Sequence, residues 1–426
     1  LDAGYALTIP VDAIAEFRIL TLNAPPEYGG FTGSTTSVVT RSGGNEVHGT
    51  LYEFFRNDLL DTRNFFSKNV EPLKQNQFGG TLGTPLKKDR LFLFGYYEGF
   101  RNHQGITQSA TVPTAAERAG DFSGLSSPLL NYAAGGVPYP GGKIPSDQFS
   151  PIAQNIIKLY PLGNVSPSIY TATEVTRQTA ERGGARLDFN QSSRDQFFAR
   201  YALSTGENFN PIDFRGSPLP GFPTRDDLRA QSAVVSNVHV FSPAMSNSLR
   251  VAFFRYWFDY EQRLNKTPPS ALGFEYASAS ALGQGPPFFN VTGYSPIGSA
   301  TSGPRLSAQN TYEAQDGLSW FLGKHSLKVG GEFRRNQLNI SQPTVPNGLI
   351  IFSSSFPASD AFANLLMGYS VGVDLGFGQF DRGLRTWNSA LYFQDEYRVS
   401  RRLTLNYGLR WEVITPISEI ENRLTP

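Results

Sequence analysis

The 426-residue sequence predicts an all-β fold, a transmembrane antiparallel up-and-down β-barrel of which this chain supplies about eleven strands. Three observations predict it. Apolar and polar residues alternate in many segments, long and short connections between these segments alternate, and aromatic residues are abundant while charged residues are few. Alternation of this kind is typical of strands with one apolar and one polar face.

The composition excludes several other classes of protein. Lys and Arg number 37 against 36 Asp and Glu, so the net charge of +1 gives no electrostatic reason to expect nucleic acid as a partner. The chain has no cysteine, which excludes a disulfide scaffold and a thiolate zinc site. No apolar run approaches the ~20 residues of a membrane-spanning helix. The 33 Phe, 19 Tyr, 42 Gly and 29 Pro indicate many strands joined by turns and loops.

Period-two alternation locates the predicted strands. In the segment 402–413, apolar residues occupy every second position, and polar or charged residues lie between them. Most such segments approach or exceed the ~9–11 residues that a tilted strand needs to cross a bilayer, whereas globular strands average ~5–6. The predicted strands are 48–57, 76–84, 90–101, 182–190, 194–204, 229–241, 245–259, 310–321, 324–336, 386–399 and 402–413.

The connections between these segments alternate in length without exception. After a medium connection at 58–75, the long ones are 102–181, 205–228, 260–309 and 338–385, and the short ones are 86–89, 191–193, 242–244, 322–323 and 400–401. In an up-and-down sheet this places every short turn at one end and every long loop at the other. Outer-membrane barrels have that asymmetry. A soluble sandwich or propeller is the alternative, but it gives no reason for strict alternation.

Two predicted strands are rich in aromatic residues. We expect both clusters to lie toward the strand ends that reach the outer membrane interface, where aromatic girdles occur. A soluble aromatic core is the alternative reading of the same residues. The clusters are Phe92, Phe94, Tyr96, Tyr97 and Phe100, and Phe253, Phe254, Tyr256, Trp257, Phe258 and Tyr260.

Two long connections contain segments with helical periodicity. Residues 147–160 place apolar side chains at i, i+3 and i+4, open near Ser150 and Pro151 and close at Pro161. Residues 359–367 show similar spacing and stop at Gly368. We expect these helices to pack the long loops against one another.

Charged residues on the polar face of the strands are the candidate site. A charge on the lipid face costs ~2–4 kcal/mol at the bilayer midplane, so these side chains are expected to line a polar lumen. The alternative is the solvated outside of a soluble sheet, which predicts the same alternation. The candidate lumen-lining residues are Arg186, Asp188, Arg200, Lys328, Glu332, Arg334, Arg410 and Glu412.

Motifs for catalysis or metal binding are weak. The four histidines, at 48, 103, 239 and 325, have no metal-ligand spacing, so we expect neither a metal nor another cofactor. Residues 368–372 match G-x-S-x-G, but a nucleophile elbow needs a strand before the serine and a helix after it. A helical pattern precedes Ser370 instead. The sequence therefore predicts a protein that is not an enzyme, and a secreted β-rich hydrolase rests on Ser370 alone.

Several ordered blocks of the sequence resemble TonB-dependent outer-membrane receptors. Residues 9–19, 27–30 and 37–45, which read IPVDAIAEFRI, EYGG and SVVTRSGGN, are similar to the last part of the plug domain in that family. Residues 46–57, 76–85, 89–101 and 395–412 resemble its Oar-like subgroup more narrowly. One departure is Thr84, where the subgroup usually has Gly before Pro85.

The resemblance implies a barrel of about 22 strands with a plugged lumen. Residues 1–45 would be the end of the plug, and residues 46–426 the N-terminal half of the barrel with external loops 102–181, 205–228, 260–309 and 338–385. The first residue is Leu1, and we expect the sequence to be a fragment that lacks most of the plug and the second half of the barrel.

The resemblance also implies a function and a location. Such receptors lie in the lipid of the outer membrane of Gram-negative-type bacteria, bind a ligand at external loops and plug, and move it across the membrane. The TonB energy-transducing complex acts on them through an N-terminal region. The alternative is a surface adhesion or structural barrel without active transport, which the long segment 102–181 suggests. The sequence does not identify the ligand, the direction of transport or the oligomeric state.

Overall fold

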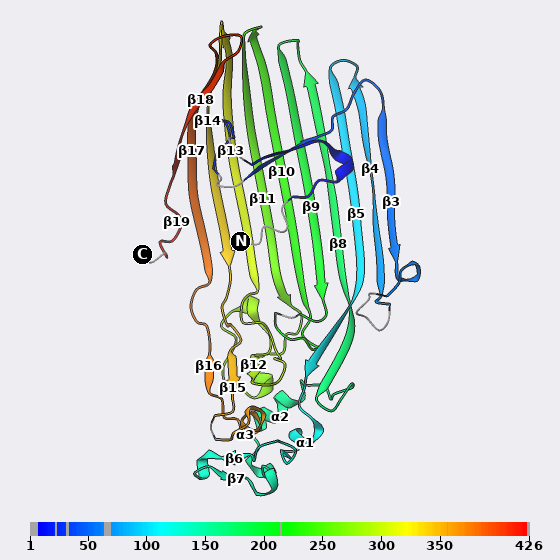
Figure 1. Ribbon diagram of the computed structural model, residues 1–426, viewed down its shortest axis with the longest axis vertical. Coiled ribbons are helices and arrows are strands. Elements are labelled where there is room, and N and C mark those ends of the chain that lie inside the picture. Colours follow the sequence, from blue (N-terminus) through cyan, green and yellow to red (C-terminus); the bar gives the residue numbers. More distant parts are fainter. Residues whose placement is uncertain are drawn as a thin grey trace.

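The computed structural model describes residues 7–21, 24–30, 34–63, 70–213, 215–355 and 357–423. One antiparallel sheet dominates these residues (Figure 1). Within the described residues this sheet has twelve strands. Eleven of them follow one another in chain order, and the short β19 pairs with β17 beside that path. The eleven predicted strands and their up-and-down order are confirmed.

Most strands of the sheet are longer than the alternation predicted, although β3 has the predicted bounds and β18 is one residue shorter. β8 covers 22 residues, and β5 pairs with it from Leu91 to Thr111. Residues 171–181 contain only three apolar residues, Ala172, Val175 and Ala180, so they lack the apolar signal of a lipid-facing strand. The strands are β3 (His48–Asn57), β4 (Leu73–Lys87), β5 (Leu91–Thr111), β8 (Ile169–Asn190), β9 (Asp195–Asn210), β10 (Thr224–Ser242), β11 (Met245–Arg263), β13 (Arg305–Leu322), β14 (His325–Ser341), β17 (Asp381–Arg398), β18 (Thr404–Ile414) and β19 (Ser418–Glu419).

The short and long connections lie at opposite ends of the sheet, as predicted (Figure 1). Tight hairpins join β4 to β5, β8 to β9, β10 to β11, β13 to β14 and β17 to β18 at one end. The long loops emerge at the other end and fold together there. No described helix is long and apolar enough to cross a membrane.

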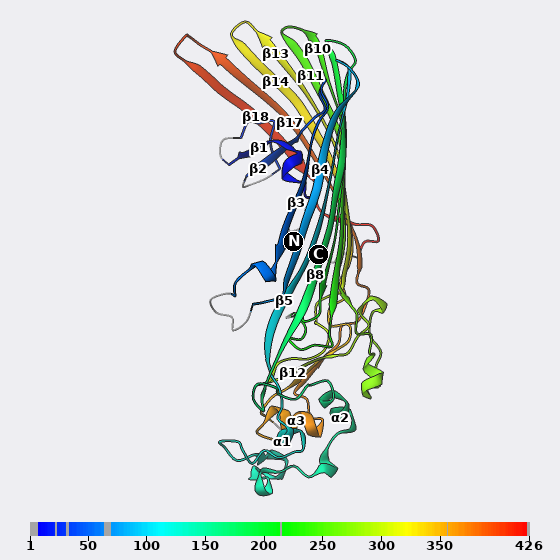
Figure 2. The ribbon, with the colours of Figure 1, turned by 90° about the vertical axis from the view of Figure 1, so that its right-hand side faces the viewer.

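The N-terminal segment lies on the concave face of the sheet (Figure 2). It consists of η2 (Val11–Ala13) and a hairpin of β1 (Ile14–Leu20) and β2 (Thr35–Thr40). Ala13, Phe94 and Tyr96 form a small buried cluster with Ile9 packed against it. We refer to the concave side as the inner face and to the opposite side as the outer face.

The outer face carries a belt of exposed apolar side chains. Two aromatic pairs lie near its edge toward the long loops, with ring centroids 5.2 Å apart for Phe253 and Tyr312 and 5.1 Å apart for Phe333 and Trp387. Exposed apolar residues of this size on a folded surface indicate contact with lipid or a partner. The belt includes Val235, Leu249, Val251, Tyr312, Val329, Phe333, Leu391, Phe393, Leu409 and Trp411.

A polar row bounds this belt on the side of the long loops. The strand register aligns the side chains Gln231, Arg255, Asn310, Gln337 and Arg385 on the outer face, two residues beyond Phe253, Tyr312 and Trp387. Charged and amide groups are costly in hydrocarbon. We therefore take this row as the outer limit of the membrane-spanning segments.

The predicted aromatic clusters divide between the two faces, which corrects their expected location. Phe94 aligns with Gly83 and Arg186, close to the hairpin between β4 and β5, and so lies at the end opposite the long loops. In β11, Phe253 faces outward while Phe254 and Phe258 face inward. Successive side chains of a strand point to opposite faces, so a run of adjacent aromatic residues cannot all face lipid.

The long loops fold into a compact unit with its own apolar core, which we name the loop cap: the described residues of 112–168, 211–223, 264–304 and 342–380. All four loops contribute buried side chains, among them Phe122, Ile156, Leu219, Phe289 and Phe362. The cap contains helices α1 (Ala115–Arg118), α2 (Pro151–Ile157) and α3 (Ala361–Met367), strands β6 (Leu130–Asn131), β7 (Val137–Pro138), β12 (Phe288–Val291), β15 (Leu349–Phe352) and β16 (Gly372–Asp374), and the short helices η4 (Tyr132–Ala134), η5 (Pro140–Gly142), η6 (Ser146–Gln148), η7 (Pro269–Leu272) and η8 (Ala281–Gly283); η3 (Asp58–Leu60) follows β3.

Both helices predicted in the loops are confirmed, as α2 and α3. Asp360 accepts a hydrogen bond from the Ala363 amide at 2.9 Å and caps α3, which ends at Gly368 with a φ of 80°. Six of the seven residues of α3 are buried, and the helix contacts α1, α2, β12 and β15. As expected, the helices pack the long loops against one another.

Candidate functional site

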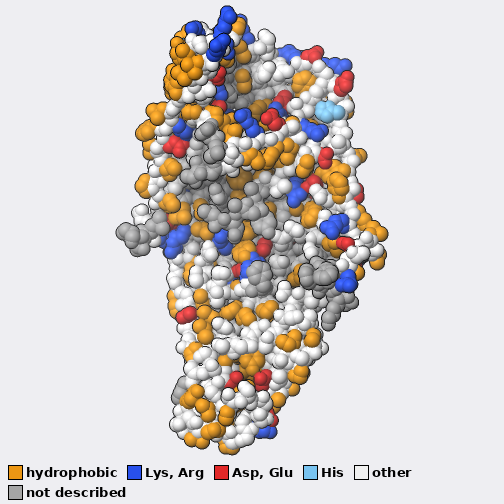
Figure 3. All heavy atoms as spheres, in the orientation of Figure 1, with side chains coloured by type: hydrophobic (Ala, Val, Ile, Leu, Met, Phe, Trp, Pro, Cys, Tyr) orange, Lys and Arg blue, Asp and Glu red, His pale blue; other side chains and the backbone are white. Residues whose placement is uncertain are grey.

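All eight predicted lumen-lining residues lie on the inner face. Arg186 of β8 lies directly opposite Arg200 of β9 in the strand register. The same row continues across β10, β11 and β13 to Arg334 on β14. Glu332 and Glu412 both align with Ala390, so they share that face. Figure 3 shows charged side chains of both signs more frequently over the sheet than over the lower end of the molecule. These residues therefore share one face of the sheet, and their role in lining a lumen stays a prediction.

Four of the eight residues join one ion-pair network. Arg334 Nη2 lies 2.7 Å from Glu332 Oε1 and 3.0 Å from Glu313 Oε2, and Arg410 Nη2 lies 3.0 Å from Glu332 Oε2. Arg410 also pairs with Glu412. The Arg410 and Glu332 side chains are only 11% and 10% exposed, so solvent screens this pair less than an ordinary surface pair. The result is a rigid polar patch across β13, β14 and β18.

This patch holds the N-terminal segment. Lys328 Nζ lies 2.8 Å and 2.9 Å from the two carboxylate oxygens of Glu27. Arg410 Nη1 donates to the backbone carbonyls of Pro26 at 3.3 Å and Glu27 at 3.5 Å. Two strands whose contact residues follow 301 and 383 positions later in the chain thus hold the short segment around Glu27.

A second patch holds the other end of the N-terminal hairpin. Arg186 donates from Nε and Nη2 to the Asp188 carboxylate at 2.8–3.0 Å, and its Nη1 donates to the Thr40 carbonyl at 3.0 Å. The guanidinium also lies 4.8 Å from the centre of the Phe198 ring. Arg200 lies beside it, and its Nε has no hydrogen-bond partner among the described residues.

A polar hollow of about 600 Å³ separates the N-terminal hairpin from the inner wall. Its lining includes Glu27, Arg250, Gln315, Lys328 and Tyr392. Acidic, basic and neutral groups are mixed around it. The hollow is large enough for several waters, and the arrangement does not select one class of ligand.

The alternation missed one buried polar cluster on the inner face. Glu98 is 3% exposed and accepts hydrogen bonds from Tyr52 Oη and Gln77 Nε2, both at 2.9 Å. It also pairs with Arg182. A single carboxylate within the segment 91–100, which has no other charged residue, is the signal that would have indicated it, because such a group needs partners when buried.

The structure does not assemble a catalytic centre around Ser370. Ser370 is exposed, α3 ends three residues before it, and β16 begins two residues after it. This is the reverse of the strand–serine–helix order that the motif requires. Among the described residues, no group of three His, Asp or Glu side chains could hold a metal ion.

Two of the histidines have structural partners near the hairpins. His239 Nδ1 lies 2.6 Å from Asp195, and His325 Nδ1 lies 2.7 Å from Asp395. The His325 ring also stacks on Tyr397 with centroids 4.3 Å apart.

Comparison with known proteins gives matches over nearly the whole chain. Residues 39–425 match the family described as outer membrane beta barrel domain. The TonB-dependent transporter Oar of Myxococcus xanthus is 26% identical over 455 aligned residues, which include 96% of this chain and 40% of the relative.

The solved structures that this chain matches include the ferric enterobactin receptor of Pseudomonas aeruginosa, as a mutant, and the siderophore receptor PirA of Acinetobacter baumannii. The first is 12% identical with a TM-score of 0.49 and is matched over 96% of this chain and 46% of its own. The second is 14% identical with a TM-score of 0.49 and is matched over 96% and 45%. The chain therefore spans less than half the length of the relatives it matches.

Proposed function

The chain belongs to the outer-membrane β-barrel family, and from this premise we propose that it is part of a TonB-dependent receptor that binds a ligand at its external loops and plug and moves it across the outer membrane. The protein lies in the outer membrane, where the apolar belt of the sheet faces lipid. Residues 1–45 are the end of the plug in this proposal, and residues 46–426 are the first half of the barrel.

The observation that carries the proposal is the docking of the N-terminal segment on the inner wall. The segment shares one small apolar cluster with the sheet, around Ala13, but its contacts around Glu27 are an ion pair and two hydrogen bonds to carbonyls. Polar contacts facing a hydrated hollow can be exchanged for water at small net cost. An element that must move inside a barrel needs contacts of this kind.

The eight inner-face residues have two roles in this proposal. Lys328, Arg410 and Arg186 hold the plug segment in its resting position, and Glu332, Arg334, Glu412 and Asp188 fix the guanidinium groups and the rest of the polar wall. Arg200 adds a positive charge beside Arg186. When the plug segment moves, these side chains would line the polar path that it leaves.

Binding to TonB tests the proposal directly. The full-length gene product, folded in detergent, is expected to bind the purified periplasmic domain of TonB and to lose this binding when its TonB-contacting segment is deleted. It is also expected to show a heat-sensitive electrophoretic shift. Recovery as a soluble monomer without detergent would refute the barrel. A folded barrel that does not bind TonB would refute the transport function and favour the adhesion or structural alternative.

A further inference from the structure

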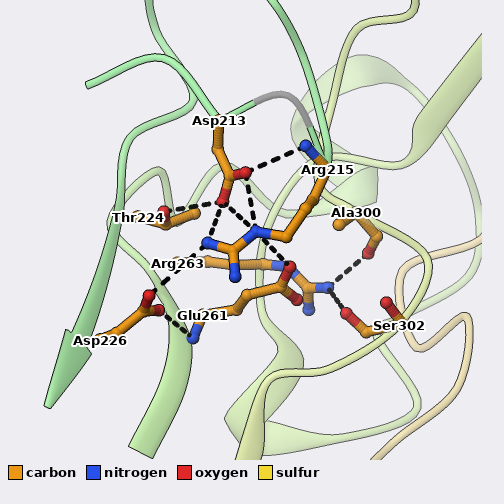
Figure 4. A network of polar contacts seen from close by, with 8 residues as sticks. All are labelled: Asp213, Arg215, Thr224, Asp226, Glu261, Arg263, Ala300 and Ser302. Carbon is orange, nitrogen blue, oxygen red and sulfur yellow. Dashed lines mark hydrogen bonds and ion pairs between the residues drawn. The ribbon is translucent and has the colours of Figure 1, made fainter. Parts of the chain in front are cut away.

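A second charge network lies where the loop cap meets the ends of β10 and β11 (Figure 4). We name it the rim network: Asp213, Arg215, Asp226, Glu261 and Arg263. Asp213 and Arg215 belong to the loop 211–223, Asp226 to β10, and Glu261 and Arg263 to β11. Arg255 of the polar row precedes Glu261 on β11, so the network lies outside the membrane-spanning segments.

The loop 211–223 is fastened to the strands by its two charged residues. Asp213 binds Arg215 Nε and Nη2 at 2.8 Å and 2.7 Å and accepts a hydrogen bond from Thr224 Oγ1 at 2.8 Å. Arg215 lies 3.6 Å from Asp226 and 3.3 Å from Glu261, and its guanidinium stands 4.3 Å from the centre of the Tyr260 ring. Asp213 is 3% exposed, so these contacts are shielded from water.

The loop 264–304 is fastened by Arg263. Its Nη2 donates to the backbone carbonyls of Ala300 and Ser302, the second at 3.4 Å. Arg263 is 3% exposed. Two loops of the cap therefore contact the same buried network at the barrel rim.

A strained backbone turns Glu261 into this network. The register between β10 and β11 shifts between Arg225 and Asp227, and Glu261 has a φ of 60°. A bulge of this kind redirects a side chain, and a positive φ costs energy for any residue other than glycine. The Glu261 amide donates to Asp226 at 2.8 Å, which helps to hold the bulge.

The charges of the rim network do not balance. Three carboxylates face two guanidinium groups, and arginine stays charged at any ordinary pH. Glu261 is 1% exposed, and neither of its oxygens has a hydrogen-bond partner among the described residues. A Cβ at Gly303 would come within 2.6 Å of Oε2, so the backbone of the loop 264–304 lies directly against this carboxyl group. Of the three acids, Glu261 is therefore the least compensated.

We propose that the rim network is a proton-dependent latch: with Glu261 protonated, it fastens the loops 211–223 and 264–304 to the barrel rim, and ionisation of Glu261 loosens both. The uncompensated negative charge would then repel Asp213 and Asp226 from within the same buried site. Arg215 and Arg263 are the cations that face Glu261, and Arg305 of β13 stands over the Phe258 ring at 5.5 Å. The latch does not depend on which ligand the protein moves.

The expected pH window follows from the two states of Glu261. Burial raises the pKa of Glu261 to about 7, whereas in a released, solvated loop it returns to its ordinary value of 4.5. The latched form therefore binds the proton more tightly, and latching weakens as the pH rises between these two values. Burial opposes the charge of Asp213, but hydrogen bonds from Arg215 keep its pKa below its usual value, so Asp213 stays ionised in this window.

Hydrogen exchange of the full-length protein in detergent tests the latch. Protection factors of the amides in 211–223 and 298–304, corrected for intrinsic exchange, are expected to fall by roughly tenfold per pH unit between pH 5 and 7 and to level off above. Glu261→Gln should abolish this dependence and keep the protection seen at pH 5. Glu275→Gln, at an exposed site in the same loop, is the matched control and should behave like the wild type.

Two outcomes would overturn the latch. One is wild-type protection that does not change between pH 5 and 7, and the other is an unchanged pH dependence in Glu261→Gln. If Glu261→Gln does not fold, Asp213→Asn provides a second test. That variant leaves two carboxylates with two guanidinium groups, so the pH window should move to lower pH, and an unmoved window would contradict the proposal.

Discussion

The sheet and the loop cap bury their side chains in opposite ways. The sheet exposes apolar residues such as Val251 and Leu391 on its outer face and carries most of its charges on the inner one, whereas the cap places Phe362, Leu365 and Phe289 in a core that excludes solvent. The difference shows that the two parts face different surroundings. A strand between lipid and a polar lumen is apolar outside, and a unit surrounded by water is apolar inside.

The largest expected effect breaks the core of the cap. Phe362 is fully buried in α3, and Phe362→Ala should destabilise the cap by ~3–5 kcal/mol because it removes a large buried side chain and leaves a cavity. Limited proteolysis should then cut within 112–168 and 342–380, while the heat-sensitive shift of the barrel remains. Phe377→Ala, at a side chain that is 78% exposed, should leave the cleavage pattern unchanged. Joint loss of cap and barrel would mean that they do not fold as separate units.

A charge on the outer face tests the other half of the comparison. Val251 is 52% exposed in the apolar belt, and Val251→Arg should cost ~2–4 kcal/mol because the charge enters hydrocarbon. Gln315→Arg, on the inner wall beside the polar hollow, should cost much less. The free energies come from urea unfolding of the full-length protein in lipid vesicles. Equal costs at both sites would contradict the assignment of the two faces.

Two substitutions of Asp360, the N-cap of α3, distinguish the contribution of its hydrogen bond to the stability of the cap from the contribution of its charge. Asp360→Ala should cost the cap ~1 kcal/mol, whereas Asp360→Asn keeps the capping acceptor and should cost little. Burial, with Glu117 nearby, raises the pKa of Asp360, so the folded cap binds the proton more tightly. Cap stability should therefore fall as the pH rises from the ordinary value of 3.8 through the raised pKa.

Hydrogen exchange of α3 at several pH values measures this effect. The wild type should show the pH dependence, and Asp360→Asn should lose it. A pH dependence that persists in Asp360→Asn would assign it to another group.

The smallest expected effect concerns the contact between Lys328 and Glu27. The Lys328 side chain is 41% exposed, so the coupling free energy of the pair in a double-mutant cycle with Lys328→Gln and Glu27→Gln should be ~0.5 kcal/mol or less. Exchange of the amides of Glu27 and Tyr28 should nevertheless increase in each single variant. A coupling of several kcal/mol would indicate a permanently fixed segment and argue against a movable plug.

Alternation in the sequence predicted the sheet well and the cap poorly. In a strand with lipid on one side and a polar lumen on the other, apolar and polar residues alternate with a period of two. Eleven segments and the shared face of Arg186, Lys328 and Arg410 could therefore be identified from the sequence alone. The cap has no such period. Its core joins Phe122, Leu219 and Phe289 from three different loops, and no local pattern specifies that association.

The same limit explains what the sequence missed at the candidate sites. The alternation of β11 would place Glu261 on the outer face, but the bulge turns its side chain to the opposite side. The bulge is visible only in the strand register. The contact of Lys328 with Glu27 joins residues 301 positions apart. The sequence analysis expected the aromatic clusters at the wrong end or on the wrong face. A local concentration of aromatic residues does not say which end of the strand lies at the outer interface, nor which face each side chain occupies.

Lipid contact along a single strand tests the central assignment most directly. In a full-length protein free of other cysteines, single fluorophores at Val329 and Phe333 of β14 should be quenched by nitroxide-labelled lipids, and fluorophores at Lys328 and Glu332 should not. Quenching that alternates with this phase would establish an outer face in lipid and an inner polar wall. Quenching without alternation, or with the opposite phase, would contradict the membrane barrel and the function proposed from it.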